Sequence, residues 1–381
     1  MEHHCIPRVD DSATHLKTEQ TKHMKPPKGS LLLLALLVAA PSVPGRCAAQ
    51  EGESAQYVGV LQREYPATYD LLIRTERAHG VLFGALAEEG DAVRATGEDV
   101  PTFGFELDMV DRLTQLVQSE GTADDAAAEA TAGFRVLGER AAAIIAYGNA
   151  FYREVLGILA DPTVVDRRAA LVDAVARYES RPDVALPTAP KSMDILYDHP
   201  YHEAFRRGYL DLDGVIWAGH WMKLAATEPL TDLRTKEERA AGLDTVMTRY
   251  YDKLSYGDPP QFFPSELPMA PAICPGLIFL STDAAMIWDN LTMMQEVLAD
   301  VLAAPDVEDV RAALDATVDH FMDATFEITD EGGWESMALA HGIFFQGGYP
   351  LAVMTKSELN VGGHAAHLRG GGHIIIPGMP G

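Results

Sequence analysis

Apolar residues recur at alternating spacings of three and four along most of this chain, and this periodicity constrains the fold more than any other feature. The clearest series lies in the most apolar segment, 277–302: Leu280, Ala284, Ile287, Leu291, Met294, Leu298 and Val301. Such spacing places side chains on one face of an α-helix, whereas a strand needs a period of two. Strand-like alternation is almost missing. We therefore predict an all-α fold.

Proline-rich and glycine-rich segments suggest how the helices are grouped. We predict an N-terminal helical bundle at 50–180, a linker at 181–191, a C-terminal bundle at 192–346 and a Gly/His-rich tail at 347–381. The linker contains three prolines and shows no periodicity, which is typical of a boundary. One large helical array is the alternative to two packed bundles.

A second proline-rich segment, 257–276, cannot continue a helix or a central strand. A long irregular loop of this kind is often a lid or a binding loop. The alternative is a loop pinned across the helices by its phenylalanines. The sequence does not choose between the two.

Residues 1–49 predict a secretory signal. The run Leu31–Ala40 is apolar and follows two lysines, but it is too short to span a bilayer. We expect Met24 to be the native start, with residues 1–23 as an upstream extension, and cleavage after Ala49. The chain would then be exported, periplasmic or extracellular, without a transmembrane segment in its mature part.

A lipid anchor at Cys47 is the minor alternative, because Arg46 stands where a lipidated cysteine normally follows a small residue. After cleavage only Cys274 would remain, so we expect no internal disulfide.

The net charge of −26 argues against a nucleic-acid partner, because such a surface repels phosphate backbones. The common motifs for nucleotide binding, serine hydrolases, zinc proteases and haem attachment are missing from the sequence. Each of those enzyme and cofactor classes therefore lacks support.

The predicted helix from Pro66 to Glu89 carries two polar residues on its apolar face. That face is formed by Tyr65, Tyr69, Leu72, Glu76, His79, Phe83 and Leu86. Glu76 and His79 stand where an apolar side chain would be cheaper to bury. They form either a structural buried pair or a candidate site, because buried titratable groups gather at functional sites.

The segment 194–223 is the richest in chemistry, and we predict one helix from Pro200 toward Thr227 with a possible bend at a glycine. The candidate residues are His202, Glu203, Asp213 and His220. His202 and His220 would be about 27 Å apart in an unbroken helix, so they cannot share one ion. The alternative assigns these residues to ordinary helix caps and core.

A third histidine, His341, lies on the apolar face of a short predicted helix. The string Ala340-His341-Gly342 repeats Ala78-His79-Gly80, and this likeness suggests that the two histidines are partners in one core. Glu76, His79 and His341 are therefore the candidate ligands of a divalent transition metal, the cofactor this pattern favours.

Three functions remain open from the sequence. The first is a binding protein that holds a metal ion or a small polar ligand at buried Glu and His side chains. The second is an enzyme that uses Glu76/His79 or Asp213/His220 for general acid–base or metal-assisted chemistry. The third is a structural or interaction protein in which the buried polar residues only set helix registry. The sequence does not indicate the oligomeric state.

Overall fold

The structure is a computed structural model that describes residues 44–96, 103–119, 130, 132–232, 235–254 and 267–342. The predicted all-α fold is confirmed: within these residues every regular element is a helix, and the only pairing of strand type is an isolated bridge between Lys191 and Ile328. The predictions for residues 1–43, for residues 257–266 and for the tail fall outside the described residues. The predicted cleavage site after Ala49 lies within the first described helix, and cleavage there stays a prediction.

The described residues up to Glu179 form five α-helices and one short 3-10 helix. They are α1 (Pro44–Glu64), α2 (Pro66–Thr96), α3 (Phe103–Gln118), η1 (Arg135–Leu137), α5 (Glu139–Ala160) and α6 (Arg167–Glu179).

The described residues from Met193 to Gly342 form one 3-10 helix and eight α-helices. They are η2 (Met193–Leu196), α7 (Ala204–Gly208), α8 (Leu210–Thr231), α9 (Lys236–Leu254), α10 (Ala270–Ile273), α11 (Pro275–Leu280), α12 (Thr282–Ala303), α13 (Val310–Met322) and α14 (Glu331–Gly342).

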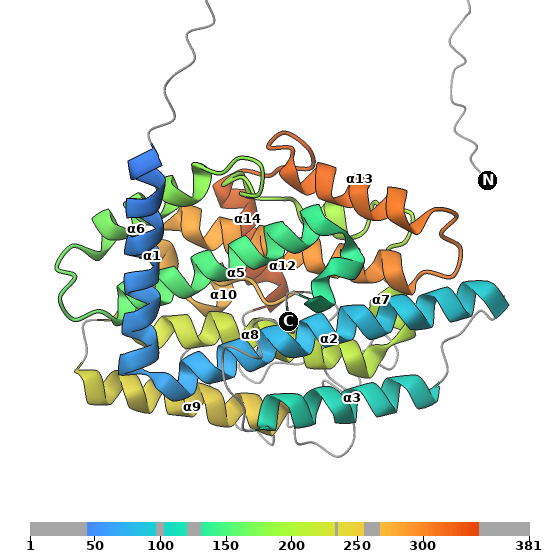
Figure 1. Ribbon diagram of the computed structural model, residues 1–381, viewed down its shortest axis with the longest axis horizontal. Coiled ribbons are helices and arrows are strands. Elements are labelled where there is room, and N and C mark those ends of the chain that lie inside the picture. The colour runs from blue at the N-terminus through green and yellow to red at the C-terminus, as the bar shows by residue number, and fades with distance from the viewer. Residues whose placement is uncertain are drawn as a thin grey trace, which may run out of the picture. The chain divides into compact units, whose positions relative to one another are not determined.

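Helix α12 forms the centre of the fold, and every residue from Ala284 to Ala303 is buried. It packs against α2, α5, α7, α11 and α13 (Figure 1). A helix surrounded on all sides reads as apolar around its whole circumference, which explains the unusually apolar sequence of this segment. Any polar side chain on α12 is consequently buried as well.

Helices from both sides of the 181–191 segment pack together. Helices α2, α3 and α5 contact α8, and α2 and α5 contact α12. The described helices from α1 onward belong to one compact unit, so the arrangement is one large helical array. Whether the two predicted bundles at 50–180 and 192–346 fold independently stays a prediction.

Two helix predictions need correction. The predicted helix 277–302 is broken at Ser281, whose hydroxyl accepts the N–H of Ala284 as the N-cap of α12. The predicted helix from Pro200 is also broken: residues 199–203 form turns, Glu203 has a φ of 61°, and Tyr209 separates α7 from α8. The break between α7 and α8 therefore falls directly after Gly208, which agrees with the expected bend at a glycine.

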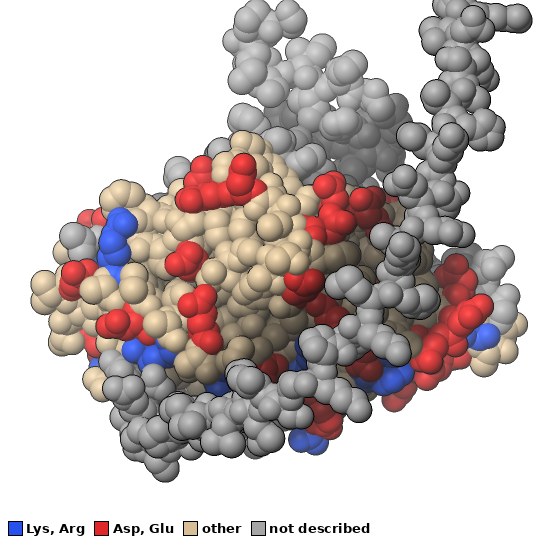
Figure 2. Space-filling view, turned by 90° about the horizontal axis from the view of Figure 1, so that it is seen from above, with Lys and Arg blue, Asp and Glu red and all other residues tan. Residues whose placement is uncertain are grey.

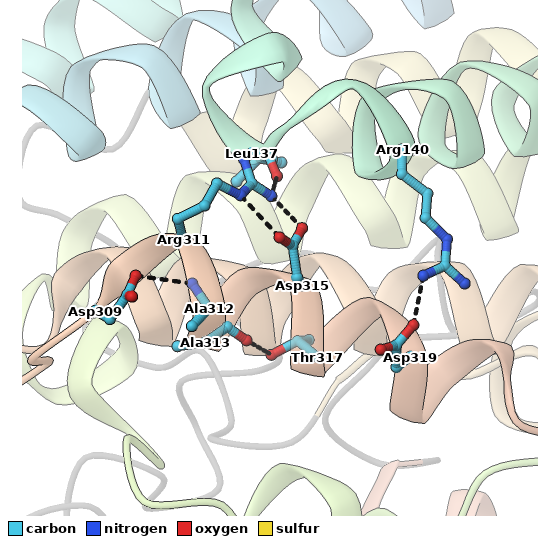
Figure 3. A network of polar contacts seen from close by, with 9 residues as sticks. All are labelled: Leu137, Arg140, Asp309, Arg311, Ala312, Ala313, Asp315, Thr317 and Asp319. Carbon is cyan, nitrogen blue, oxygen red and sulfur yellow. Dashed lines mark hydrogen bonds and ion pairs between the residues drawn. The ribbon is translucent and has the colours of Figure 1, made fainter.

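Polar contacts attach α13 to the start of α5 (Figure 3). Arg311 donates to the carbonyl of Leu137 at 2.6 Å and pairs with Asp315, and Arg140 pairs with Asp319. These side chains are partly exposed, so each pair contributes only about 0–1 kcal/mol to stability. They fix the position of α13, which forms one wall of the cavity described below.

Acidic side chains are spread over the surface while Lys and Arg are sparse, as the face in Figure 2 shows. This distribution agrees with the net charge of −26. Among the described residues, no helix has the length and apolar composition needed to cross a membrane.

Candidate functional site

Three helices bring polar side chains together in the middle of the array. Helix α2 supplies His79, α8 supplies His220, and α12 supplies Thr292, Gln295 and Glu296. We call these five residues the polar core. All are at least 98% buried.

The imidazoles of His79 and His220 meet edge to face, with ring centroids 4.9 Å apart and an interplanar angle of 81°. Their helices come this close because Gly219 has no side chain. A Cβ at Gly219 would lie 2.8 Å from Nε2 of His79 and 3.0 Å from the methyl group of Thr75. Gly219 therefore makes room for the histidine pair.

Glu296 approaches the pair from α12. Its Oε1 lies 3.5 Å from Nδ1 of His220, beyond an ordinary hydrogen bond between these groups. Seven atoms of the polar core have no hydrogen-bond partner within the protein: Nε2 of His79, both ring nitrogens of His220, Oγ1 of Thr292, Oε1 of Gln295 and both carboxyl oxygens of Glu296. The Gln295 side chain is close enough to both imidazoles to favour their protonated forms. Folded proteins normally satisfy their buried polar groups, so this concentration calls for a specific explanation.

Burial shifts the pKa values of the polar core toward the neutral forms. Desolvation lowers the pKa of His79 and of His220 well below its usual value, and the nearby charge of Lys223 acts in the same direction. Desolvation raises the pKa of Glu296 to about 8, with the charge of Asp300 adding to the effect and Arg206 opposing it. Near neutral pH the site offers two uncharged imidazoles beside a largely protonated carboxyl group.

A second group of buried charges lies one turn away. Asp213 of α8 is buried, and desolvation together with the charge of Glu296 raises its pKa well above its usual value. Arg206 lies 3.9 Å from Oδ2 of Asp300, and Asp300 accepts the backbone N–H of Phe205 at 2.8 Å. Asp300 thereby holds α7 against α12.

His199 extends this group toward the surface. Its Nε2 lies 3.5 Å from Oδ2 of Asp300, and its side chain is 15% exposed. It lines a cavity of about 310 Å³ between the 195–201 turn, α12 and α13. Titratable side chains thus run from this cavity through Asp300 and Glu296 to His79.

A second cavity, of about 400 Å³, lies at the α1–α6 side of the array and is lined by Asp161, Asp166, Asp173 and Arg177 among others. Arg177 is paired there with the buried Glu154 at 2.5 Å. This cavity does not include any residue of the polar core.

Glu76 is paired with an arginine from another helix. Its two carboxyl oxygens accept from Nη1 of Arg153 on α5, both at 2.5 Å. This is the structural buried pair that the sequence left open, with arginine as the partner instead of histidine. Sequence spacing could not reveal Arg153, because the contact joins residues 77 positions apart.

The remaining candidates are separated by the structure. His202 is exposed and its Nδ1 lies 3.1 Å from the carbonyl of His199, while Glu203 precedes α7 and pairs with Arg207. His220 is the candidate that meets His79. The side chain of His341 lies outside the described residues, so its predicted partnership with His79 stays a prediction.

Within the described residues, no three His, Cys, Asp or Glu side chains are arranged to hold a metal ion. The metal site predicted at Glu76, His79 and His341 remains a prediction that depends on His341. The described geometry does not add support to it, since the carboxylate of Glu76 already forms a salt bridge with Arg153.

Sequence reasoning missed Gln295, Glu296, Asp300 and Lys223. A signal was present: α12 is apolar all round, so its few polar residues had to be buried with it. Lys223 follows His220 by one turn and is fully buried, with Nζ 3.5 Å from Oδ1 of Asn149 and 5.0 Å from the ring centroid of Trp288. Desolvation lowers its pKa to about 8.

No protein-family model matches the chain, and no curated protein or solved structure is significantly similar to it. Its function must therefore be argued from the geometry of its own residues.

Proposed function

We propose that this chain is an exported binding protein whose helical core holds a small polar molecule at His79, His220, Gln295 and Glu296. One observation carries the proposal: these residues contribute six of the seven buried polar-core atoms that have no hydrogen-bond partner within the protein. Each unsatisfied buried group costs about 1–3 kcal/mol, and a ligand that bonds to several of them recovers that cost on binding. Export rests on the signal-like sequence of residues 31–49.

The chemistry of the groups defines the class of ligand. Each neutral imidazole has one nitrogen that accepts a hydrogen bond and one that donates, while the amide oxygen of Gln295 and the hydroxyl oxygen of Thr292 can accept. Glu296 can donate one while protonated and accept several. The ligand is therefore a small molecule rich in hydrogen-bond donors, such as an amide, a polyol or an amine. The site binds it through hydrogen bonds and not through an ion pair.

Mass spectrometry tests this proposal on the full-length chain. Native mass spectrometry of the purified protein is expected to show a bound small molecule that is absent from a Gln295→Leu/Glu296→Met variant. Asp283→Asn is the matched control, because Asp283 is an exposed carboxylate on the same helix. A wild-type chain with no bound species, which also takes up none from mixtures of small amides, polyols and amines, would refute the proposal.

Elemental analysis of the same samples separates the metal alternative. We expect no metal that depends on His79 after incubation with Zn²⁺, Fe²⁺, Cu²⁺ or Mn²⁺. A stoichiometric metal that is lost in a folded His79→Ala variant would replace the small-molecule proposal with the metal site predicted from the sequence. Metal retained by that variant points to the histidines of the C-terminal tail.

The enzyme alternative is supported by one observation: a carboxyl group with a pKa of about 8 faces a neutral imidazole across 3.5 Å. A carboxyl group with this pKa can donate a proton to a substrate near neutral pH, as general acid catalysis requires. Infrared titration of the carboxyl stretch, assigned with Glu296→Gln, tests this directly. If Glu296 ionises in the ordinary carboxylate range, it cannot serve as the acid near neutral pH.

A further inference from the structure

The 310 Å³ cavity beside His199 is a site that neither the sequence nor the proposed function uses. Residues from four segments line it: the turn at 195–201, Val297 of α12, the inner face of α13, and Phe326 with Glu327 after α13. Its volume lies at the lower end of the range for small-molecule sites. It can therefore accept a ligand of about one ring.

Aromatic side chains form much of its wall. Phe321 is completely buried at the base, and Tyr201 and Phe326 are partly buried. The ring of Phe326 stacks on that of His320, with centroids 4.0 Å apart and planes at 13°. These rings offer flat faces to an apolar body and favourable positions for a cation.

The charged side chains that line the cavity are both acidic. They are Asp198, which is exposed, and Glu327, which is partly buried. A buried cation, Lys191, lies beside the cavity: its Nζ is 6.0 Å from the ring centroid of Phe326 and donates to the carbonyls of His320, Asp323 and Phe326. Its charge also interacts with that of Glu327. Lys191 is thus engaged by these carbonyls and is not one of the lining residues.

The backbone of Glu327 supports a role for its side chain. Its φ is 44°, a left-handed conformation in which glycine is usual and which costs a residue with a side chain about 1–3 kcal/mol. Its carbonyl accepts the N–H of Ser192 at 2.7 Å, and the bridge between Lys191 and Ile328 flanks it. The surrounding structure holds a glutamate at the cavity in a conformation that glycine would adopt more easily.

We propose that this cavity binds a small organic amine, with the ammonium group between Asp198 and Glu327 and the apolar part against Phe321, Phe326 and Tyr201. The site is separate from the polar core and does not depend on the function proposed there.

Calorimetric titration of the full-length chain with benzylamine, benzyl alcohol and benzoate tests the proposal, at mildly alkaline pH where ordinary imidazoles are uncharged. The three probes share one ring and differ in charge. We expect benzylamine to bind at least about tenfold more tightly than benzyl alcohol, because one favourable charge contact of about 1.4 kcal/mol gives that factor. Benzoate should bind most weakly.

Two variants locate the site. Glu327→Gln keeps the shape and removes one charge, so benzylamine affinity should fall about tenfold. Ala316→Phe on α13 should fill the cavity and abolish binding of all three probes. Glu308→Gln, at an exposed acid outside the cavity, is the matched control and should bind as the wild type does. Thermal unfolding confirms that each variant is folded, and Asp198→Asn replaces Glu327→Gln if the latter is not.

The proposal is overturned if benzylamine does not bind, if it binds no better than benzyl alcohol, or if Ala316→Phe leaves its affinity unchanged. Loss of amine binding would leave the polar-core proposal untouched, since that is tested by mass spectrometry with variants on α12.

Discussion

Helix α12 carries two sets of buried polar residues, and their surroundings differ sharply. The side chains of Asp289 and Asn290, near its start, are hydrogen-bonded within the protein. Asp289 accepts from the N–H of Ala270 and from the indole of Trp334, while Asn290 accepts from Lys191 and donates to the carbonyls of Pro187 and Ala189. Two turns later, Gln295 and Glu296 contribute three oxygen atoms that make no hydrogen bond.

The difference separates a structural polar group from a candidate functional one. Asp289 and Asn290 pin loops and short helices that have little apolar surface of their own, and each bond they make replaces one lost to water. The three oxygens of Gln295 and Glu296 lose their hydrogen bonds to water on burial and gain none within the protein. Proteins keep such groups where function requires them, and stability is lower as a result. Four predictions test this comparison.

Replacement of Lys191 by Met should produce the largest effect. Lys191 is fully buried and its ammonium group satisfies three backbone carbonyls at 2.6–2.8 Å. Loss of these charge-assisted bonds leaves the carbonyls without partners, so we expect the free energy of unfolding to fall by about 3 kcal/mol. Urea unfolding followed by circular dichroism measures this. A variant as stable as wild type would show that the satisfied region does not depend on its polar contacts.

Replacement of Gly219 by Ala should have the next largest effect. The added methyl group would collide with His79 and Thr75, and overpacking of this kind costs about 2 kcal/mol. Gly84→Ala is the control on α2, because a Cβ there meets nothing within 4 Å, and it should stabilise by about 0.5–1 kcal/mol. Equal effects of the two changes on thermal unfolding would contradict the close packing of the histidine pair.

Replacement of Glu296 by Met should act in the opposite direction. Methionine has a similar shape and leaves no carboxyl group to bury, so we expect about 1 kcal/mol of added stability at neutral pH. Bound small molecule should be lost at the same time. A destabilised variant would show that Glu296 has a structural partner, and the contrast within α12 would disappear.

The pH dependence of that gain should be the most specific signal. The pKa of Glu296 rises from an ordinary 4.5 to about 8 on folding, so the folded chain binds the proton more tightly and loses stability as pH rises through this interval. The advantage of Glu296→Met over wild type should therefore grow from about pH 5 to about pH 9. His79 and His220 act at the other end, because their lowered pKa values remove stability as pH falls below 6.5. Urea unfolding of both proteins across this pH range measures the effect. A difference in the free energy of unfolding that does not change with pH would show that the pKa of Glu296 is not raised on folding.

The sequence by itself determined the helical class and several individual buried residues. Alternating spacings of three and four identified the apolar faces, and Glu76 and His79 stood out because they interrupt one of them. These inferences succeeded because each depends on the geometry of a single helix, which local spacing fixes.

Only the tertiary structure decided which of these residues meet. His79 lies beside His220 from α8, while Glu76 belongs to Arg153 from α5. Glu203 and Tyr209 break the segment that the sequence predicted as one helix, because contacts such as those from Asp300 to the backbone of residues 203 and 205 override local helix preference there. Partners of this kind are distant in sequence, and helical periodicity gives only the face on which a residue lies. The packing of α2 and α8 against α12 determines what that face contacts.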